Sequence, residues 1–201
     1  MLLEIILAFF IGSIPTGYLL TKYGGYGDIR KVGSGNIGAT NVLRHSGKKL
    51  GLITLFIDIA KGFLPIYYAT YYFSLYNTSD AGFISLVGMV TILGHIFSPW
   101  LKFKGGKGVA TTLGVLLAIL IILDQTNIFF LTLLVWSLVV FFSKYVALGS
   151  VVSLIFLVFY SYFSFNEYFI FFLFITILVA YKHKDNFERI KNNKEHKISF
   201  F

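Results

Sequence analysis

The chain has 201 residues, of which 57% are hydrophobic and only 13% are charged, and its mean hydropathy is +0.79. Soluble domains contain about 45–50% apolar and about 25% charged residues, so this composition excludes a soluble globular protein and indicates an integral membrane protein. Because the chain contains no cysteine, it has no disulfide bond, no thiol nucleophile and no cysteine-based metal site.

Seven apolar runs follow one another along the chain, and short polar segments separate them. A membrane-spanning helix needs about 20 residues, within a range of about 17–25. Four runs are shorter, but uncharged neighbours such as Gly108 and Gln125 can lengthen some of them. We therefore expect an all-α membrane protein with seven spans in a single domain, residues 1–201; five spans with re-entrant pieces are the alternative. The runs are Ile5–Leu20, Leu52–Phe73, Phe83–Trp100, Val109–Leu123, Ile128–Phe142, Val146–Phe163 and Tyr168–Tyr181.

The basic residues outside the apolar runs fall on one side of the expected membrane. Sixteen of the 17 Lys and Arg residues follow the first, third, fifth or seventh run, and Lys61, inside the second run, is the exception. The opposite segments contain Glu4, Asp80, Asp124 and Glu167 but no Lys or Arg. The positive-inside rule therefore predicts that the N-terminus is outside and the C-terminus is cytoplasmic. These basic loops explain the pI of 9.5 without a nucleic acid partner, and they favour anionic headgroups of the lipid bilayer.

The first polar segment, "KVGSGNIGATNVLR", covers residues 31–44. Its glycines let backbone N–H groups approach a ligand, its hydroxyl and amide side chains add neutral donors, and Arg44 supplies a planar, permanently charged donor suited to phosphate or carboxylate. A flexible interfacial loop is the alternative interpretation. The candidate ligand-binding residues are Gly33, Ser34, Gly35, Asn36, Thr40, Asn41 and Arg44.

The second polar segment, "GHIFSPWLKFKGGKGVATTLG", covers residues 94–114. Its "KGGKG" precedes an apolar run, so its amides would lie near the positive N-terminal end of a helix and favour an anion. It is not a Walker A loop, because Lys107 is followed by Gly108 instead of Ser or Thr. A basic loop that holds lipid headgroups is the alternative, and His95 is interpreted as a hydrogen-bonded residue at the end of a span. The candidate anion-binding residues are Lys104, Gly105, Gly106 and Lys107.

Two further groups of polar residues stand at helical spacing. In the tail, residues 181–197, His183 and Asn186 would face the same way at the membrane exit, although such a tail is often only a solvated basic end. In "DIAKG", Asp58 and Lys61 lie three residues apart inside the second run. An unpaired charge at that depth is costly, so we expect the two to pair or Lys61 to reach a polar cavity, with structural support favoured over direct substrate contact.

The order of "GSIPTGYLL", "SGNIGATNVLR", "DIAKG", "GH…FKGGKGVAT" and "HKDNFERI…E" resembles the PlsY family of bacterial membrane acyl phosphate:glycerol-3-phosphate 1-acyltransferases. The likeness extends from about Gly12 to Glu195. It implies a compact bundle of seven transmembrane helices in the bacterial plasma (inner) membrane, with a cytoplasmic active site. It also implies transfer of a fatty acyl group from acyl phosphate to the 1-hydroxyl of sn-glycerol 3-phosphate, the first acylation step of phospholipid biosynthesis. The products are 1-acyl-sn-glycerol 3-phosphate (lysophosphatidic acid) and phosphate.

The resemblance also implies roles for individual residues. The first family motif puts its functional serine at Ser34 and its arginine at Arg44. The C-terminal motif puts a catalytic histidine at His183, an asparagine at Asn186 and a structural glutamate at Glu195. The glycine-rich motif puts phosphate binding on Lys104, Gly105, Gly106 and Lys107. The chain departs from the family pattern at Lys182, Phe187 and Asn193, where the family usually has Arg, Ile and Gly.

The expected substrates are free acyl phosphate and glycerol 3-phosphate, without CoA or acyl carrier protein as direct donor, and without a metal or other cofactor. Both substrates are anions, so a cluster of Arg44, Lys104, Lys107 and backbone amides is the main requirement. The proton of the attacking hydroxyl has two candidate acceptors, a phosphate oxygen of the donor, which we favour, and His183. The alternative functions are a membrane transporter of a phosphorylated small molecule and a non-catalytic lipid-binding scaffold.

Overall fold

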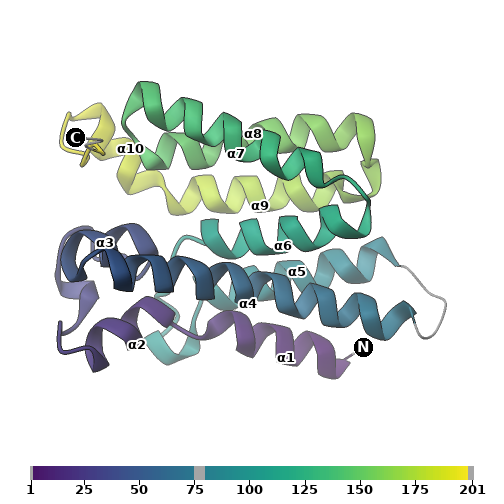
Figure 1. The fold of residues 1–201 in the computed structure, drawn as a ribbon, viewed down its shortest axis with the longest axis horizontal. Coiled ribbons are helices and arrows are strands. Elements are labelled where there is room, and N and C mark those ends of the chain that lie inside the picture. The colour runs from purple at the N-terminus through teal and green to yellow at the C-terminus, as the bar shows by residue number, and fades with distance from the viewer. Residues whose placement is uncertain (1, 75–79, 199–201) are drawn as a thin grey trace. The chain divides into compact units, whose positions relative to one another are not determined.

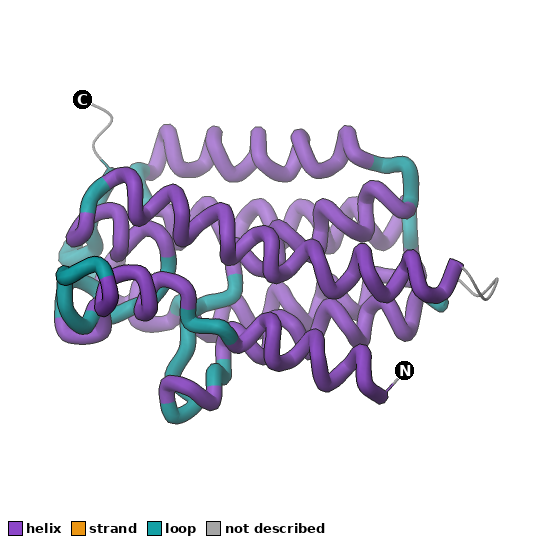
Figure 2. Tube along the Cα trace, turned by 60° about the horizontal axis from the view of Figure 1, so that its bottom comes forward, coloured by secondary structure: helices purple, strands orange, loops and turns teal. Residues whose placement is uncertain are grey.

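The structure is a computed structural model that describes residues 2–74 and 80–198 (Figure 1). Within these ranges every regular element is a helix (Figure 2), so the all-α prediction is confirmed for the described chain. The chain forms two compact units, residues 1–119 and 120–201. Each of the seven predicted apolar runs is helical.

Within the described residues, unit 1 contains five complete α-helices, two 3₁₀ turns and most of a sixth α-helix. They are α1 (Leu2–Ser13), α2 (Thr16–Tyr23), the 3₁₀ turn η1 (Ile29–Lys31), α3 (Ala39–Ser46), α4 (Lys48–Ser74), α5 (Ala81–Ile96), the 3₁₀ turn η2 (Pro99–Leu101) and most of α6 (Val109–Ile122). Unit 2 begins with the last turn of α6. Its other elements are α7 (Thr126–Ser143), α8 (Val146–Ser164), the 3₁₀ turn η3 (Asn166–Tyr168), α9 (Phe169–Lys182) and α10 (Lys184–Lys191).

The first predicted run, Ile5–Leu20, is not one continuous helix. It breaks between Ser13 and Thr16, and α1 and α2 meet at an angle of 43°. Pro15 causes the break, because proline has no N–H to donate and disfavours the helical conformation of the residue before it. The break leaves the end of α1 and the start of α2 beside the polar loops of unit 1.

Several helices fit a multi-pass membrane protein. Among the described residues, four helices are long and apolar enough to cross a membrane: α4, α5 extended by η2, α7 and α8. The bent pair α1–α2 makes a fifth if it counts as one span. Helix α6 has 14 residues, which makes it about 21 Å long, whereas the hydrocarbon core of a bilayer is about 30 Å thick. The predicted number of seven spans therefore stays a prediction.

Glycines allow the helices of unit 1 to approach at backbone distance. A Cβ at Gly12 of α1 would overlap the backbone of Thr91 in α5, and a Cβ at Gly94 of α5 would overlap the carbonyl oxygen of Phe9. Small residues at such crossings are typical of packed membrane helices. Helix α4 contacts α1, α2, α3 and α5, so it forms the centre of unit 1 and links the polar segments around it.

In unit 2, α8 packs against α7 and α9, and α10 contacts both α8 and α9. The segment after α10 returns to the turn between α7 and α8, where the amide of Ile198 donates to the carbonyl of Lys144 at 2.9 Å. The basic segments that follow the fifth and seventh runs therefore lie side by side, as the predicted alternation of loops requires for this unit.

Candidate active site

Asn41, in the first turn of α3, holds the loop of residues 32–38 in shape. Its side chain is buried, and its Oδ1 accepts a hydrogen bond from the amide of Ser34 at 3.2 Å. A Cβ at Gly33, where φ is +58°, would overlap this same Oδ1, so a glycine is required there. The Nδ2 group donates to the carbonyls of Ile29 at 3.3 Å, Val32 at 3.1 Å and Asn36 at 2.9 Å.

The side chains predicted to meet a ligand surround this fixed loop. Ser34, Thr40 and Arg44 are exposed, and Asn36 is half-buried. Thr40 and Arg44 stand four residues apart on α3, so they share one face of that helix. The loop therefore presents two hydroxyls and a guanidinium group to solvent, on a backbone whose shape Asn41 sets.

Arg30, the other arginine near this loop, is engaged elsewhere. Its guanidinium group hydrogen-bonds Asp28 at 2.6 and 2.9 Å and lies over the ring of Tyr18 at 4.7 Å. The hydrogen bond from the Arg30 side chain is the main reason that the pKa of Asp28 falls from 3.8 to about 2. Since the folded pKa lies below the unfolded one, the contact stabilises the loop fully above about pH 4 and is lost as the pH falls towards 2. The charge of Arg30 is therefore paired with Asp28 within the fold.

The glycine-rich loop folds back onto the end of α5. Lys102 and Phe103 both adopt left-handed backbone conformations, with φ of 54° and 60°. The chain then returns, and the amides of Gly105 and Gly106 donate to the carbonyls of Ile96 at 3.0 Å and His95 at 3.1 Å. These two N–H groups are thus used within the fold. Anion binding by Gly105 and Gly106 stays a prediction.

The other groups of this loop that are predicted to bind an anion are its lysines. Lys104 is exposed and Lys107 is half-buried. The two glycines between them set the path of the chain, while the lysine side chains supply the positive charge. The loop therefore offers ammonium groups on a fixed turn rather than a cradle of glycine amides.

A small hydrophobic core joins the two polar loops of unit 1. Leu101, from η2, packs with three residues of the first loop region, and the four form one buried cluster; the other three members are Ile29, Ile37 and Val42. The hydroxyl of Ser98 donates to the carbonyl of Ser13 at 2.6 Å, and the indole N–H of Trp100 donates to the Ser13 hydroxyl at 2.8 Å. Sequence reasoning missed Ser13, Ser98 and Trp100, because hydrogen bonds between positions more than 80 residues apart leave no local signal. The two loops thus lie at the same end of unit 1.

Asp58 and Lys61 form the ion pair expected from their spacing. Their charged groups are 2.7 Å apart, and both side chains are buried in unit 1. The ammonium group of Lys61 also donates to the carbonyl of Ile14 at 2.7 Å, at the break between α1 and α2. The pair therefore ties α4 to this break, which agrees with the structural role favoured from the sequence.

In unit 2, His183 stands at the junction of α9 and α10. Its Nδ1 lies 2.8 Å from the carbonyl oxygen of Val179. Because a carbonyl can only accept, Nδ1 carries the proton, and Nε2 is the acceptor nitrogen of the neutral ring. The side chains of His183 and Asn186 are both buried, and the amide of Asn186 donates to the His183 carbonyl at 2.9 Å.

Glu195 fixes the segment that follows α10. One carboxylate oxygen accepts from Nδ2 of Asn186 at 2.9 Å, and the other accepts from Nε of Arg189 at 2.7 Å. The chain reverses through Asn193, whose φ is +55°. Asparagine tolerates this left-handed conformation better than most residues, which explains how it replaces the usual glycine. The contacts of Glu195 fit the structural role that the resemblance implies.

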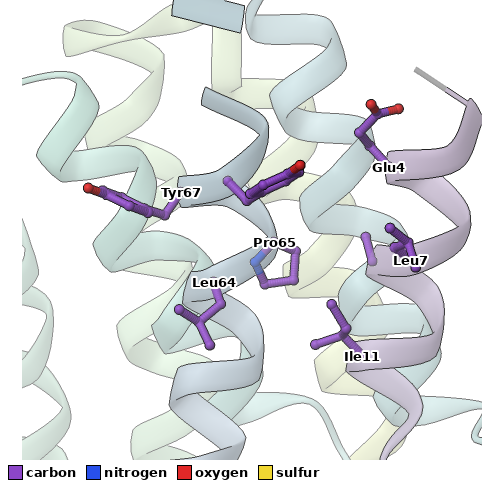
Figure 3. A pocket seen from close by; sticks show the side chains of 8 residues that line it. Glu4, Leu7, Ile11, Leu64, Pro65 and Tyr67 are labelled. Atoms are coloured by element: carbon purple, nitrogen blue, oxygen red, sulfur yellow. The ribbon is translucent and has the colours of Figure 1, made fainter. Parts of the chain in front are cut away.

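A cavity of about 300 Å³ lies between α1 and α4, away from the polar loops. Figure 3 shows the carboxylate of Glu4 at one end of it and the side chains of Ile11 and Leu64 towards the other. Its walls are mostly apolar, which suits hydrocarbon, and none of the predicted site residues lines it. The lining residues are Glu4, Leu7, Ala8, Ile11, Leu64, Pro65, Tyr67 and Tyr68.

Residues 2–193 match a family model described as glycerol-3-phosphate acyltransferase. The chain belongs to the glycerol-3-phosphate acyltransferase family. It is 43% identical to the glycerol-3-phosphate acyltransferase of Endomicrobium trichonymphae, over 100% of this chain and 96% of the relative. It is 40% identical to that of Thermotoga petrophila, over 98% of this chain and 95% of the relative.

The fold matches solved structures of the same family. The crystal structure of PlsY (YgiH), an integral membrane glycerol 3-phosphate acyltransferase, in its glycerol 3-phosphate form superimposes with a TM-score of 0.88 at 34% identity, and covers 98% of this chain and 95% of that one. The lysophosphatidic acid form gives a TM-score of 0.85 at 32% identity, with the same coverage. The chain is therefore a multi-pass membrane protein of this family, as its sequence motifs predicted.

Proposed function

We propose that this protein transfers a fatty acyl group from acyl phosphate to the 1-hydroxyl of sn-glycerol 3-phosphate, and so makes lysophosphatidic acid and phosphate. Membership of the family supports the acylation of glycerol 3-phosphate. The single observation that best supports the location of the proposed active site is the buried cluster of Leu101 with Ile29, Ile37 and Val42. This cluster holds the loop that bears Arg44 and the loop that bears Lys104 at one end of unit 1, where two anionic substrates need positive charge.

The reaction needs positioning more than activation, because an acyl phosphate is a mixed anhydride. The C1 hydroxyl oxygen attacks the acyl carbonyl carbon, the bond from this carbon to the phosphate oxygen breaks, and the electron pair leaves with phosphate. The hydroxyl proton passes to a phosphate oxygen of the donor; Nε2 of His183 is the alternative acceptor. Holding the two reactants in place lowers the barrier by several kcal/mol, up to roughly 7–11 kcal/mol in ideal cases.

The residues of the first loop divide into two roles. Arg44 binds a substrate phosphate through charge-assisted hydrogen bonds, and Ser34 orients a reactant with its exposed hydroxyl. Thr40 and Asn36 add neutral hydrogen-bonding groups at the edge of the same loop. Asn41 acts on the substrate indirectly, because all its observed hydrogen bonds go to the loop backbone and hold Gly33, Ser34 and Gly35 in place.

In the glycine-rich loop, Lys104 and Lys107 stabilise phosphate charge, and Gly105 and Gly106 give the chain its tight path. In unit 2, His183 and Asn186 hold glycerol 3-phosphate, and Glu195 fixes the orientation of Asn186 through its carboxylate. This assignment follows the family motifs residue by residue.

The donor, the location and the acyl chain complete the proposal. Free acyl phosphate is the donor, with no CoA thioester or acyl carrier protein as a direct donor. The enzyme lies in the bacterial inner membrane with its phosphate-binding loops in the cytoplasm, because the loops that carry the basic residues define that side. The fatty chain lies between membrane helices, and the apolar cavity between α1 and α4 is of a kind that accepts hydrocarbon.

Turnover by the purified protein in detergent tests this function. We expect phosphate release that depends on both acyl phosphate and glycerol 3-phosphate, with lysophosphatidic acid identified by mass spectrometry. Acyl-CoA and acyl carrier protein thioesters, supplied at the same concentration, should give no product. A transporter cannot turn over substrate without a second compartment, and a lipid-binding scaffold cannot do so at all. Product formation from a thioester but not from acyl phosphate would reject the proposed donor.

A further inference from the structure

His95, at the end of α5, lies between the buried ion pair and the glycine-rich loop. Only about 4% of this residue is exposed, as for Lys61, and Asp58 is 2% exposed. The Nδ1 atom of His95 is 4.0 Å from Oδ1 of Asp58. On the other side, the ring meets Gly106, because a Cβ at Gly106 would overlap Nε2 of His95.

The backbone reinforces this contact. The carbonyl of His95 accepts the amide of Gly106 at 3.1 Å, and a Cβ at Gly105 would overlap the same carbonyl. Both the ring and the main chain of His95 therefore fix the turn that separates Lys104 from Lys107. A continuous set of contacts runs from Ile14 through Lys61, Asp58 and His95 to Gly106.

The buried charges in this set of contacts have a high desolvation cost, so the set stabilises the fold inefficiently. Removing an ion pair from water costs several kcal/mol per charge, and well-packed apolar residues often stabilise a core as well or better. Buried charges within a membrane protein therefore point to function or to a specified geometry. Here the geometry specified is that of a loop whose lysines stand beside the substrate phosphates in the proposed reaction.

We infer that His95, which lies beside the Asp58–Lys61 pair, is a positioning residue that sets the glycine-rich loop for phosphate binding. This inference rests on the proposed function. His95 lies under the loop, so it acts through Gly106 and the neighbouring lysines. Its role differs from that of a residue that only stabilises the fold, because its loss should impair catalysis more than stability.

The first test compares three variants of the purified enzyme. We expect His95→Ala to lower kcat/KM about 10- to 100-fold, since a shift of about 1 Å in a positioned group costs up to about 10²-fold. His95→Gln, which keeps a polar side chain of similar length, should recover part of this loss. Thr91→Val is the matched control: Thr91 is buried one turn earlier on α5, and its hydroxyl bonds only within the helix, to the Val87 carbonyl. We expect it to change kcat/KM by less than about twofold.

The second test is a double-mutant cycle with Lys104→Ala. If His95 acts through the loop, His95→Ala should reduce kcat/KM much less in the Lys104→Ala background than in the wild type. Equal fold-losses in the two backgrounds would show that His95 acts independently of the lysine, and would overturn the inference. Thermal unfolding of each variant separates loss of structure from loss of activity.

A variant that fails to fold does not end the test. If His95→Ala cannot be purified, Gly106→Ala disturbs the same contact from the side of the loop. We expect Gly106→Ala to lower kcat/KM about as much as expected for His95→Ala, and His95→Gln to lower kcat/KM less. A wild-type kcat/KM in Gly106→Ala would contradict the role of His95. So would a wild-type kcat/KM in both single variants, His95→Gln and His95→Ala, if both fold. A wild-type protein without acyl phosphate turnover would instead contradict the proposed function, so the two failures are distinct.

Discussion

Arg44 and Lys104 are the single residues on which the proposed chemistry depends most. Each Ala substitution should lower kcat/KM by a factor of about 10 to 1,000, because charge-assisted hydrogen bonds worth roughly 1.5–4 kcal/mol are lost. Arg44→Lys should recover only part of the loss, since lysine keeps the charge but not the planar pair of donors. Lys49→Ala, at an exposed lysine of the same unit, is the control. Near-normal efficiency in a folded Arg44→Ala or Lys104→Ala variant would remove that residue from the site.

Ser34 should bind and orient a reactant without ever carrying the acyl group. The donor is already activated, and a serine nucleophile requires a base that hydrogen-bonds its hydroxyl. Single turnover followed by intact-protein and peptide mass spectrometry should give an unmodified Ser34 at every time point. An acyl adduct on this residue that forms and decays at the rate of turnover would show a covalent mechanism instead.

Variants of His183 distinguish the two candidate proton acceptors, the donor phosphate and His183 itself. With Nδ1 bonded to the Val179 carbonyl, Nε2 can either accept the hydroxyl proton or only orient the substrate. We expect His183→Gln and His183→Asn to lose about 10- to 100-fold in kcat while the shape of the pH–rate profile persists, because positioning is the part lost. General-base catalysis typically contributes about 10²–10⁴-fold. A larger fall, with loss of an acidic limb in the histidine range, would make His183 the base.

Residue types predicted which groups are candidates for the site, but not which hydrogen bonds each side chain forms in the fold. Arg44 and Lys104 were predicted from charge and loop composition and from the family motifs, and both are exposed, which is compatible with a phosphate-binding role that stays a prediction. Asn41 has the same composition signal as Asn36, yet its amide is used to shape the loop. The difference depends on which backbone carbonyls the fold brings within reach, and spacing along the chain does not encode that.

At the scale of elements, apolar periodicity predicted where helices lie but not where they bend. Pro15 ends a helix, whereas Pro65 lies inside the continuous helix α4. Both prolines remove a hydrogen-bond donor, so the local sequence offers the same signal at both positions. What differs is the surroundings: the break at Ile14 offers a carbonyl that the ammonium group of Lys61 binds from another helix. Such compensation between distant elements is visible only in the folded chain.

The tail after α10 should lose its order when Glu195 is neutralised. Asn186 and Arg189 both present donors to this carboxylate, so Glu195→Gln places an N–H₂ group against a donor and costs about 1–3 kcal/mol locally. We expect faster amide hydrogen exchange over residues 183–198 and a higher KM for glycerol 3-phosphate. Glu188→Gln, at an exposed position on α10, is the matched control. Unchanged exchange and KM in Glu195→Gln would show that the carboxylate is dispensable.

For the whole molecule, the distribution of charge predicts the orientation in the membrane. The chain has no cysteine, so single introduced cysteines report accessibility without background. Lys49→Cys and Lys191→Cys, at exposed sites on the basic side, should resist a membrane-impermeant thiol reagent in intact cells and react after lysis. Glu167→Cys, at an exposed site on the other side, should react in intact cells. The reverse pattern would reject the predicted topology.

The cluster of Leu101 with Ile29, Ile37 and Val42 also sets an order in time for the synthesis of the enzyme. Val42 leaves the ribosome 59 residues ahead of Leu101, an interval of about 3–12 s at about 5–20 residues per second. During that interval Asn41 already has its partners, all within 12 residues of it. The hydrophobic support from Leu101 arrives only with η2, after the end of α5, so the loops that bear Arg44 and Lys104 come together only once both elements have been made.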